Sequence, residues 1–212
     1  MDGPPIRGRL RQQKLGAAHA HGDHLLFLDW GLKPIDSGWL TALLEFSQQA
    51  AIGAVGAKLH YPDGSLKHVG ILLGVNGVAA PALHRYPRSS LGYFGAAIAA
   101  RNYSAVSGEC LMTRRAVHDS VGGFDDEMGR FADVDYCLRV TRAGYRVVFT
   151  PHAALVQSKE ASSSSDADAD GANRLRMRWS DRLAQDPFYN RNFSRDTPDY
   201  GLDLTASPAP EP

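Results

Sequence analysis

The chain has 212 residues, of which 43% are hydrophobic and 22% are charged. Such fractions are typical of a globular protein, and the length suits one domain with appendages better than two full domains. Lysine plus arginine equal aspartate plus glutamate at 23 each, so the net charge is zero and indicates neither nucleic acid nor an anionic membrane surface as a partner. The apolar runs are too short to cross a bilayer, so no membrane span is predicted.

Two features predict the cellular setting. Cys110 and Cys137 are too few for a disulfide framework, and their surroundings do not suggest a metal knuckle. The opening residues, MDGPPIRGRLRQQK, are polar and basic and are not followed by an apolar stretch, which is unlike a secretion signal. A reducing setting in the cytoplasm is therefore expected.

The first part of the chain predicts alternating strands and helices. Residues 1–14, with two adjacent prolines and little periodicity, are expected to form a flexible lead-in. Residues 24–29 are a short apolar run ended by an acid, which is typical of a buried strand. Apolar residues at helical spacing predict a helix over 39–46, capped by Asp36 or Ser37. A second buried strand is expected over 52–59.

The remaining elements are predicted from turns and glycines. Pro-Asp-Gly at 62–64 predicts a turn, because proline presets the first turn dihedral and glycine accepts a positive φ. The expected elements that follow are a strand over 68–75, a long surface loop with one short helix over 77–95, a strand over 103–113, helices over 114–121 and 133–143, and a strand over 145–150 stopped by Pro151. A helix, a glycine and an apolar strand in succession indicate the α/β class.

Composition divides the chain into five segments. They are a lead-in over 1–14, one domain over 15–161, a low-complexity linker over 162–171, a helix and extension over 172–204, and a disordered tail over 205–212. The linker, SSSSDADADG, has the composition of a mobile segment. Within the extension, residues 175–183 have the spacing of an amphipathic helix.

Six short motifs occur in order between residues 25 and 153. They are LLFLD (25–29), GAVGAKLHYPDGSLKHVG (53–70), SAVSGECLMTRR (104–115), VGGFDD (121–126), DVDYCLR (133–139) and GYRVVFTPHA (144–153). Together these motifs resemble the family 2 glycosyltransferases of the GT-A fold. The later DPFYNRNFS (186–194) resembles a stretch of bacterial members that act on cell-surface polysaccharides, which implies polysaccharide biosynthesis for the cell envelope, in the cytoplasm or at the inner face of the membrane.

The resemblance implies a Rossmann-like mixed sheet flanked by helices. Only 28 residues precede Asp29, and a strand–helix unit needs about 30 residues, so the first strand–helix units of the fold are expected to be lacking. The chain is then an N-terminally truncated, acceptor-side portion of the GT-A domain. The sheet left behind would expose an edge, which predicts a dimer or a partner chain that covers it.

The resemblance also implies a reaction, in which a sugar passes with inversion from a nucleotide-sugar to a glycan or lipid-linked acceptor. Such a transfer needs a carboxylate that accepts the proton of the attacking hydroxyl. Asp133 matches the position of this base, although Ala132 stands where the family carries an acidic residue or asparagine. An acid in the first turn of a helix also favours the helix dipole without any catalysis, so a structural role for Asp133 stays open.

The family holds a divalent cation, Mg²⁺ or Mn²⁺, with an Asp-x-Asp motif that Asp29-Trp30-Gly31 resembles. Asp29 keeps the first ligand, whereas Gly31 has no ligand atom. Where many relatives carry a further histidine ligand, residues 156–159 offer an amide, a hydroxyl and Lys159, whose charge repels a cation. These changes argue against an ordinary metal site and predict impaired activity. Capping of a turn is an equal alternative for Asp29.

Further substrate-binding residues are implied by position. Ser107, Gly108 and Glu109 match the loop that lies beside the acceptor in the family. Trp30 suits stacking on a sugar, although packing is the default role of an aromatic side chain. Asp135 is a second acid in the DVDYCLR motif, for either a structural or an acceptor-side contact, and Arg139 closes that motif.

Two hypotheses about function remain from the sequence. The first is a glycosyltransferase with Asp133 as its base. The second is a non-catalytic GT-A remnant that binds a glycan or supports a partner, as the changes at Gly31, Ala132 and Lys159 suggest.

Overall fold

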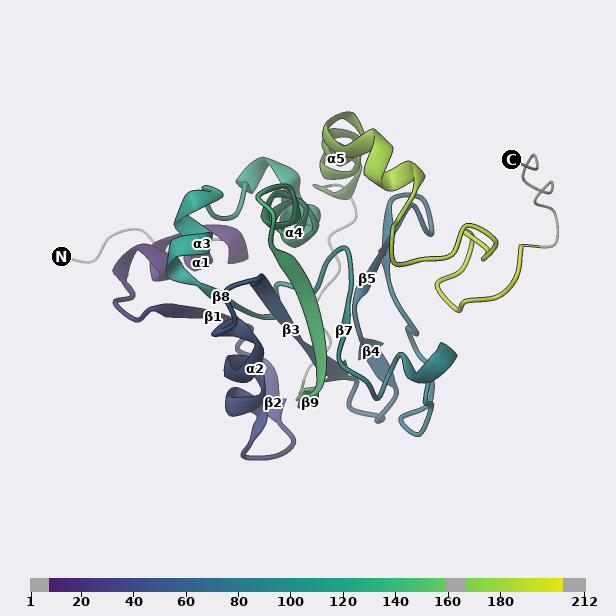
Figure 1. Ribbon diagram of the computed structural model, residues 1–212, viewed down its shortest axis with the longest axis horizontal. Helices are drawn as coiled ribbons and strands as arrows, with labels where there is room; N and C mark the ends of the chain where they lie inside the picture. Colours follow the sequence, from purple (N-terminus) through teal and green to yellow (C-terminus); the bar gives the residue numbers. More distant parts are fainter. Residues whose placement is uncertain (1–7, 159–166, 204–212) are drawn as a thin grey trace.

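The computed structural model describes residues 8–158 and 167–203. A seven-stranded mixed sheet runs through its centre, with helices on both faces (Figure 1). Its strands are β1 (His24–Leu28), β2 (Leu32–Pro34), β3 (Ile52–His60), β4 (Leu66–His68), β7 (Arg101–Asn102), β8 (Cys110–Arg114) and β9 (Arg146–Gln157), while β5 (Ile71–Leu73) and β6 (Ala79–Pro81) pair separately. The helices are α1 (Arg9–His19), α2 (Trp39–Ser47), α3 (Arg115–Ser120), α4 (Ala132–Arg142) and α5 (Ala167–Ala184), with short 3₁₀ helices η1 (Tyr93–Gly95) and η2 (Asp126–Phe131). The predicted α/β class is confirmed.

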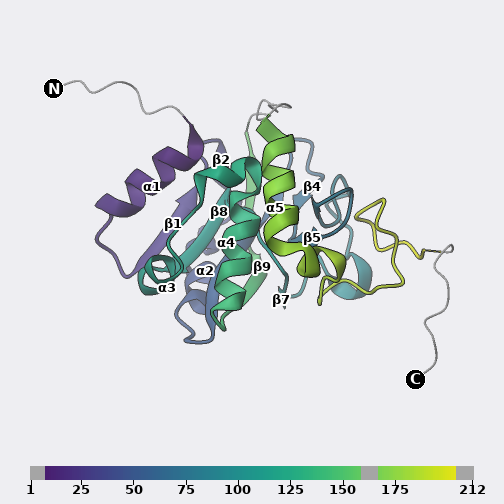
Figure 2. The same cartoon turned by 90° about the horizontal axis from the view of Figure 1, so that it is seen from above.

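The strand order decides which loops meet. The sheet has the order β1-β8-β3-β9-β2, in which β3 and β9 are parallel and β8 runs antiparallel to both β1 and β3. Seen from above, α1 lies beside β1, and α4 and α5 cross the same face of the sheet (Figure 2). Because Leu28 pairs with Cys110, the carboxyl end of β1 adjoins the residues that precede β8. Asp29 is thereby brought next to Glu109.

Two apolar cores, one on each face, hold the sheet between its helices. On one face α2 packs Leu43 against Val55 and Leu155 of the sheet. The opposite face buries Phe149, Val134 of α4 and the residues beneath α5. Every residue of β3 is buried, and apart from Lys58 and His60 its sequence consists of apolar and small residues, as expected of a central strand covered on both faces. No helix among residues 8–158 and 167–203 has both the length and the hydropathy needed to cross a membrane.

The terminal helices differ from the predicted lead-in and linker. Residues 9–14 belong to α1, because Leu, Arg, Gln and Lys favour a helix once the prolines at positions 4 and 5 are passed. Residues 167–171 of the expected linker are the first turns of α5, and the rest of that linker lies outside the described residues, as does the predicted tail. Residues 175–183 lie within α5 as predicted, with Leu175, Trp179 and Leu183 buried at a spacing of four residues, but the non-helical φ of −132° at Trp179 interrupts the helix there.

Two predicted strands in the middle of the chain were wrong, and a predicted surface loop was right only in part. Residues 68–75 are split between β4 and β5 at Gly70, whose φ of 140° breaks the strand. Residues 77–95 contain β6 and bury Val78, Ala80, Ala82 and Leu83 in the core, whereas most of 84–95 is exposed and includes the short helix η1, so the predicted surface loop is correct only for that later part. Residues 103–109 are irregular, and only Cys110–Arg114 form a strand there.

The last strand continues past Pro151, contrary to prediction. β9 runs from Arg146 to Gln157 and pairs with β3 along most of that length. The register between the two strands shifts after Ala57, so Thr150 and Ala154 face consecutive residues of β3. Proline lacks a backbone N–H and is tolerated at such an irregularity, where no ladder hydrogen bond is lost.

Gly56 is expected to be intolerant of a side chain. Gly56 lies on the central strand β3, and a Cβ there would overlap the fully buried Val106. Gly56→Ala should therefore lower the free energy of unfolding by about 1–3 kcal/mol. Gly16→Ala is the control, because a Cβ at this position of α1 meets nothing within 4 Å and should stabilise the helix by about 0.5–1 kcal/mol. Urea unfolding of the two variants measures both effects, and equal effects would contradict this packing.

Candidate functional site

The candidate site lies where the end of β1, the loop before β8 and the start of α4 meet. Asp29 follows β1, and its backbone N–H donates to the carbonyl oxygen of Glu109 at 2.8 Å. The backbone N–H of Gly108 donates to Oδ2 of Asp133 at 2.9 Å. The structure thus brings together Asp29, Ser107, Gly108, Glu109 and Asp133, which the sequence assigned to metal, acceptor and base.

Asp133 is held as a half-buried carboxylate in the first turn of α4. Its Oδ1 accepts the N–H of Val134 at 2.8 Å, while Oδ2 is bound by Gly108. Burial raises the pKa of Asp133, against the opposing effects of Arg9 and of these two hydrogen bonds. A raised pKa brings the carboxylate closer to the range in which it takes up a proton efficiently near neutral pH.

Glu109 is fixed by Lys67 of β4. Oε2 of Glu109 lies 2.5 Å from Nζ of Lys67, and both side chains are mostly buried. Glu109 also interacts electrostatically with Asp29 and Asp133 and raises the pKa of each. Lys67 offsets one negative charge of this group, which we call the carboxylate cluster (Asp29, Glu109 and Asp133).

Two cavities meet at the carboxylate cluster. One has a volume of about 400 Å³ and is lined by Tyr61, Lys67, His84, Glu109 and Asp133, among others. The other has a volume of about 690 Å³ and lies toward α1, with Arg9, Asp29, Gly108, Glu109 and Asp133 in its wall. Glu109 and Asp133 line both cavities, so a molecule in either one can reach the carboxylate of Asp133.

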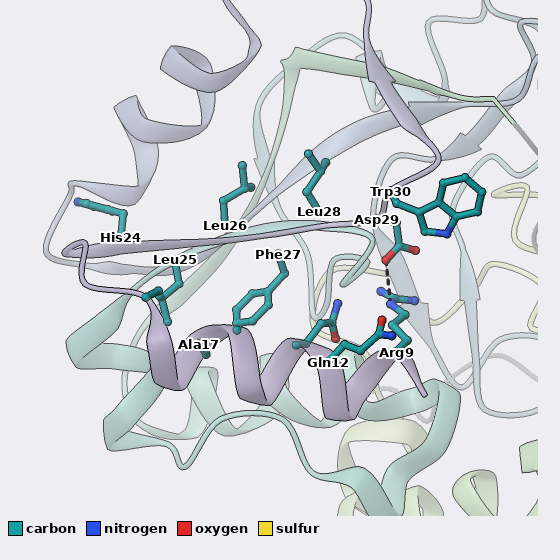
Figure 3. Close-up of a pocket in the computed structure, with 13 residues that line it drawn as sticks. Arg9, Gln12, Ala17, His24, Leu25, Leu26, Phe27, Leu28, Asp29 and Trp30 are labelled. Carbon is teal, nitrogen blue, oxygen red and sulfur yellow. Dashed lines mark ion pairs between the residues drawn. The ribbon is translucent and has the colours of Figure 1, made fainter. Parts of the chain in front are cut away.

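A third hollow, of about 540 Å³, separates α1 from β1. Figure 3 shows Leu25 and Phe27 pointing from β1 toward α1, while Arg9 reaches from the helix to the carboxylate of Asp29. Nε of Arg9 lies 3.1 Å from Oδ1 of Asp29. Trp30 follows Asp29 at one end of this hollow and is 86% exposed, so burial in the core does not account for it.

The residues around Asp29 do not fit a divalent cation. Burial raises the pKa of Asp29, and the carboxylate has the Arg9 guanidinium beside it. Gly31 supplies no ligand atom, and Lys159 lies outside the described residues. Within the described part of the chain, no three His, Cys, Asp or Glu side chains are grouped to hold a metal ion. One carboxylate already paired with arginine is a poor donor set for Mg²⁺ or Mn²⁺.

Asp135 and Arg139 are not brought to the carboxylate cluster. Asp135 is fully buried, with its Oδ2 2.8 Å from Nε of Arg139 and its Oδ1 bound by Arg178 at 3.0 Å and by the indole N–H of Trp179 at 2.9 Å. Arg139 also donates to the carbonyl oxygens of Val121 and Gly123. These contacts tie α4 to α5 and to the loop before η2. Of the two roles left open for Asp135, these contacts favour the structural role over contact with the acceptor.

Sequence reasoning missed two residues of the site. Arg9 fell in the expected lead-in, where no motif singled it out. His68 was not identified as a site residue from the sequence, yet its ring nitrogens lie 2.9 Å from the backbone nitrogen of Gly70 and 2.7 Å from that of Ser107. The only available signal for His68 was its place at the end of the GAVGAKLHYPDGSLKHVG motif.

His68, which contacts the loop before β8, makes the free energy of unfolding dependent on pH. Burial lowers the pKa of His68 from 6.5 to about 3. The unfolded chain therefore binds a proton between these values that the folded chain does not, and stability falls as pH drops through this window. Between pH 7 and pH 5, this one group should remove about 2 kcal/mol from the free energy of unfolding.

Comparison with a His68→Asn variant, by urea unfolding at both pH values, measures this contribution. From pH 7 to pH 5, the free energy of unfolding of His68→Asn should fall by about 2 kcal/mol less than that of the wild type. The control is His21→Asn, at an exposed position, which should show the same change between the two pH values as the wild type. An unchanged pH dependence in His68→Asn would contradict the buried neutral ring.

Comparison with known proteins decides the family. Residues 19–182 match the family model described as "Glycosyltransferase like family 2". The chain belongs to this family. It is 34% identical over 195 residues to the O-antigen biosynthesis protein RfbC of Myxococcus xanthus, covering 88% of this chain and 15% of that protein. It is 31% identical over 149 residues to the N-acetylglucosaminyl-diphospho-decaprenol L-rhamnosyltransferase of Mycobacterium tuberculosis, covering 66% of this chain and 47% of the relative.

A solved structure supports the fold. The structure of GalNAc-T7 with UDP, GalNAc and Mn²⁺ superposes with a TM-score of 0.57 at 14% identity, over 82% of this chain and 35% of that one. The predicted GT-A fold is confirmed by this likeness. The chain spans less than half the length of each of these proteins.

Proposed function

We propose that this chain forms the acceptor side of an inverting glycosyltransferase, which passes a sugar from a nucleotide-sugar to a glycan or lipid-linked acceptor. The observation that carries the proposal is the position of Asp133. Its carboxylate is oriented by the Gly108 N–H at the junction of two cavities, within a chain of a glycosyltransferase family. The smaller cavity suits the acceptor, and the larger cavity, which has Asp29 in its wall, suits the donor sugar.

Asp133 acts as the base in this proposal. The acceptor hydroxyl attacks the anomeric carbon, the bond from that carbon to the diphosphate oxygen breaks, and the electron pair leaves with the nucleotide diphosphate. The hydroxyl proton passes to Asp133, whose pKa is raised by burial. Attack opposite to the leaving group inverts the anomeric centre.

Glu109, Ser107 and Gly108 position the acceptor. Lys67 holds Glu109 at the wall of the smaller cavity, where Tyr61 and His84 are joined by a hydrogen bond of 2.9 Å. A carboxylate, an aromatic ring and an imidazole are groups that bind sugar hydroxyls and the apolar face of a sugar. Trp30 offers a further stacking surface.

The named relatives support the substrate class. One takes part in O-antigen biosynthesis, and the name of another is that of a rhamnosyltransferase for a diphospho-decaprenol substrate. We extend this to polysaccharide biosynthesis for the cell envelope, in the cytoplasm at the inner face of the membrane. The outer edge of β1 offers a place for a second copy or another chain, which sedimentation of the purified protein tests.

The alternative is a non-catalytic module that binds a glycan or supports a partner. It is favoured by the Arg9–Asp29 ion pair, which stands where the family carries its metal site, and it predicts impaired chemistry. Incubation with a panel of UDP- and GDP-sugars and glycan acceptors, followed by mass spectrometry of the products, tests both. Turnover of any donor supports the enzyme, whereas glycan binding without turnover supports the module.

A further inference from the structure

Arg9 occupies the space between two members of the carboxylate cluster. Its Nε contacts Oδ1 of Asp29 at 3.1 Å (Figure 3). A Cβ added to Gly108 would lie 3.1 Å from Nη2 of Arg9 and 3.2 Å from Cβ of Asp133, so the guanidinium lies near Asp133 as well. One side chain from α1 therefore spans from the end of β1 toward the start of α4.

The charges of the cluster require a cation there. Asp29, Glu109 and Asp133 repel one another, and Lys67 is engaged with Glu109. Arg9 is the strongest electrostatic influence that favours the charged form of both Asp29 and Asp133. A guanidinium stays protonated at any physiological pH and is a fixed positive charge.

We propose that Arg9 takes the place of a divalent cation at Asp29, so that this chain does not bind Mg²⁺ or Mn²⁺ at the carboxylate cluster. Two observations support the proposal beyond the ion pair itself. Gly31 removes a second ligand, and the described residues hold no group of metal-ligating side chains elsewhere. The guanidinium and a hydrated cation would also repel each other at this separation.

Gly31 makes the exclusion of a metal reversible by mutation. A Cβ at Gly31 meets nothing closer than Oγ of Ser158 at 4.0 Å, and its backbone dihedral is one that ordinary residues adopt. An aspartate at position 31 therefore fits without strain. If Arg9 is what excludes a metal, then an added carboxylate should create a site only after Arg9 is neutralised.

Electron paramagnetic resonance of Mn²⁺ alone, titrated with protein, tests this without any sugar donor, so it does not depend on the proposed function. Four proteins are compared: the wild type, Arg9→Gln, Gly31→Asp, and the double variant. The wild type should leave the signal of free Mn²⁺ unchanged at protein concentrations up to about 1 mM. The double variant should bind Mn²⁺ at least tenfold more tightly than either single variant.

Arg11→Gln combined with Gly31→Asp is the matched control, because Arg11 is an exposed arginine of the same helix. It should behave like Gly31→Asp alone. Mn²⁺ binding by the wild type that Asp29→Asn abolishes would overturn the proposal. Equal binding by Gly31→Asp and the double variant would overturn it as well, since Arg9 would not then be the excluding group. Because the wild-type titration needs no substitution, it tests the exclusion of Mn²⁺ even if a variant fails to fold.

Discussion

Asp133→Asn should lower sugar transfer by about a hundredfold to ten-thousandfold, because an amide cannot accept the proton of the acceptor hydroxyl. The amide is nearly the same size, and its oxygen can still accept the N–H of Gly108, so the loop before β8 keeps its anchor. The loss should therefore fall on the rate of transfer and leave glycan binding almost unchanged. Transfer of a radiolabelled sugar under saturating donor measures the rate.

Asp119→Asn is the matched control for this experiment, since Asp119 is an exposed carboxylate on α3 away from both cavities. It should transfer sugar at the wild-type rate. Equal rates for Asp133→Asn and the wild type would remove Asp133 from the role of base. Its position would then be explained by the helix N-terminus alone.

Asp135→Ala should lower the free energy of unfolding by about 3–5 kcal/mol, because it leaves its charged partners in a buried network without a counter-charge. Asp135 is fully buried between Arg139 of its own helix and Arg178 and Trp179 of α5. Without it, two guanidinium groups lose their common partner and the indole N–H has no acceptor there. The attachment of α5 to α4 should loosen first, which urea unfolding followed by tryptophan fluorescence reports.

Asp181→Asn tests the same helix at an exposed position and should change stability by less than about 0.5 kcal/mol. Asp135→Asn should lie between the two, since its oxygen can still accept from Trp179 but carries no charge for the arginines. A loss below about 1 kcal/mol for Asp135→Ala would mean that this network is worth no more than a surface ion pair.

Much of the fold follows from local patterns in the sequence. The strand before Asp29 and the helix predicted over 133–143, which is α4 (Ala132–Arg142), follow from the apolar and glycine residues within and next to each element. The extension of β9 past Pro151 was not, since it depends on a register shift against β3 that no local pattern records. The first part of the segment 77–95 was mistaken for a surface loop, because Val78, Ala80 and Leu83 are buried by distant parts of the chain.

The site was predictable as a set of residue types but not as a set of contacts. Asp29, Glu109 and Asp133 were identified through motifs, and the antiparallel pairing of β1 with β8 then explains why the first two meet. Arg9 belongs to no motif, and its contact with Asp29 arises from the placement of α1 against β1. Asp135 and Arg139 share a motif with Asp133, but helical spacing turns Asp135 toward α5 instead.

The most direct test of the carboxylate cluster as the reaction site is an amide-resolved NMR titration of the chain with a nucleotide-sugar and, separately, with a glycan acceptor. We expect the acceptor to shift the amide signals of Gly108, Glu109 and Val134, which surround Asp133, and the donor to shift those of Asp29 and Gly108. Shifts confined to residues outside the two cavities, or no shifts with any donor and acceptor, would contradict a reaction site at this cluster.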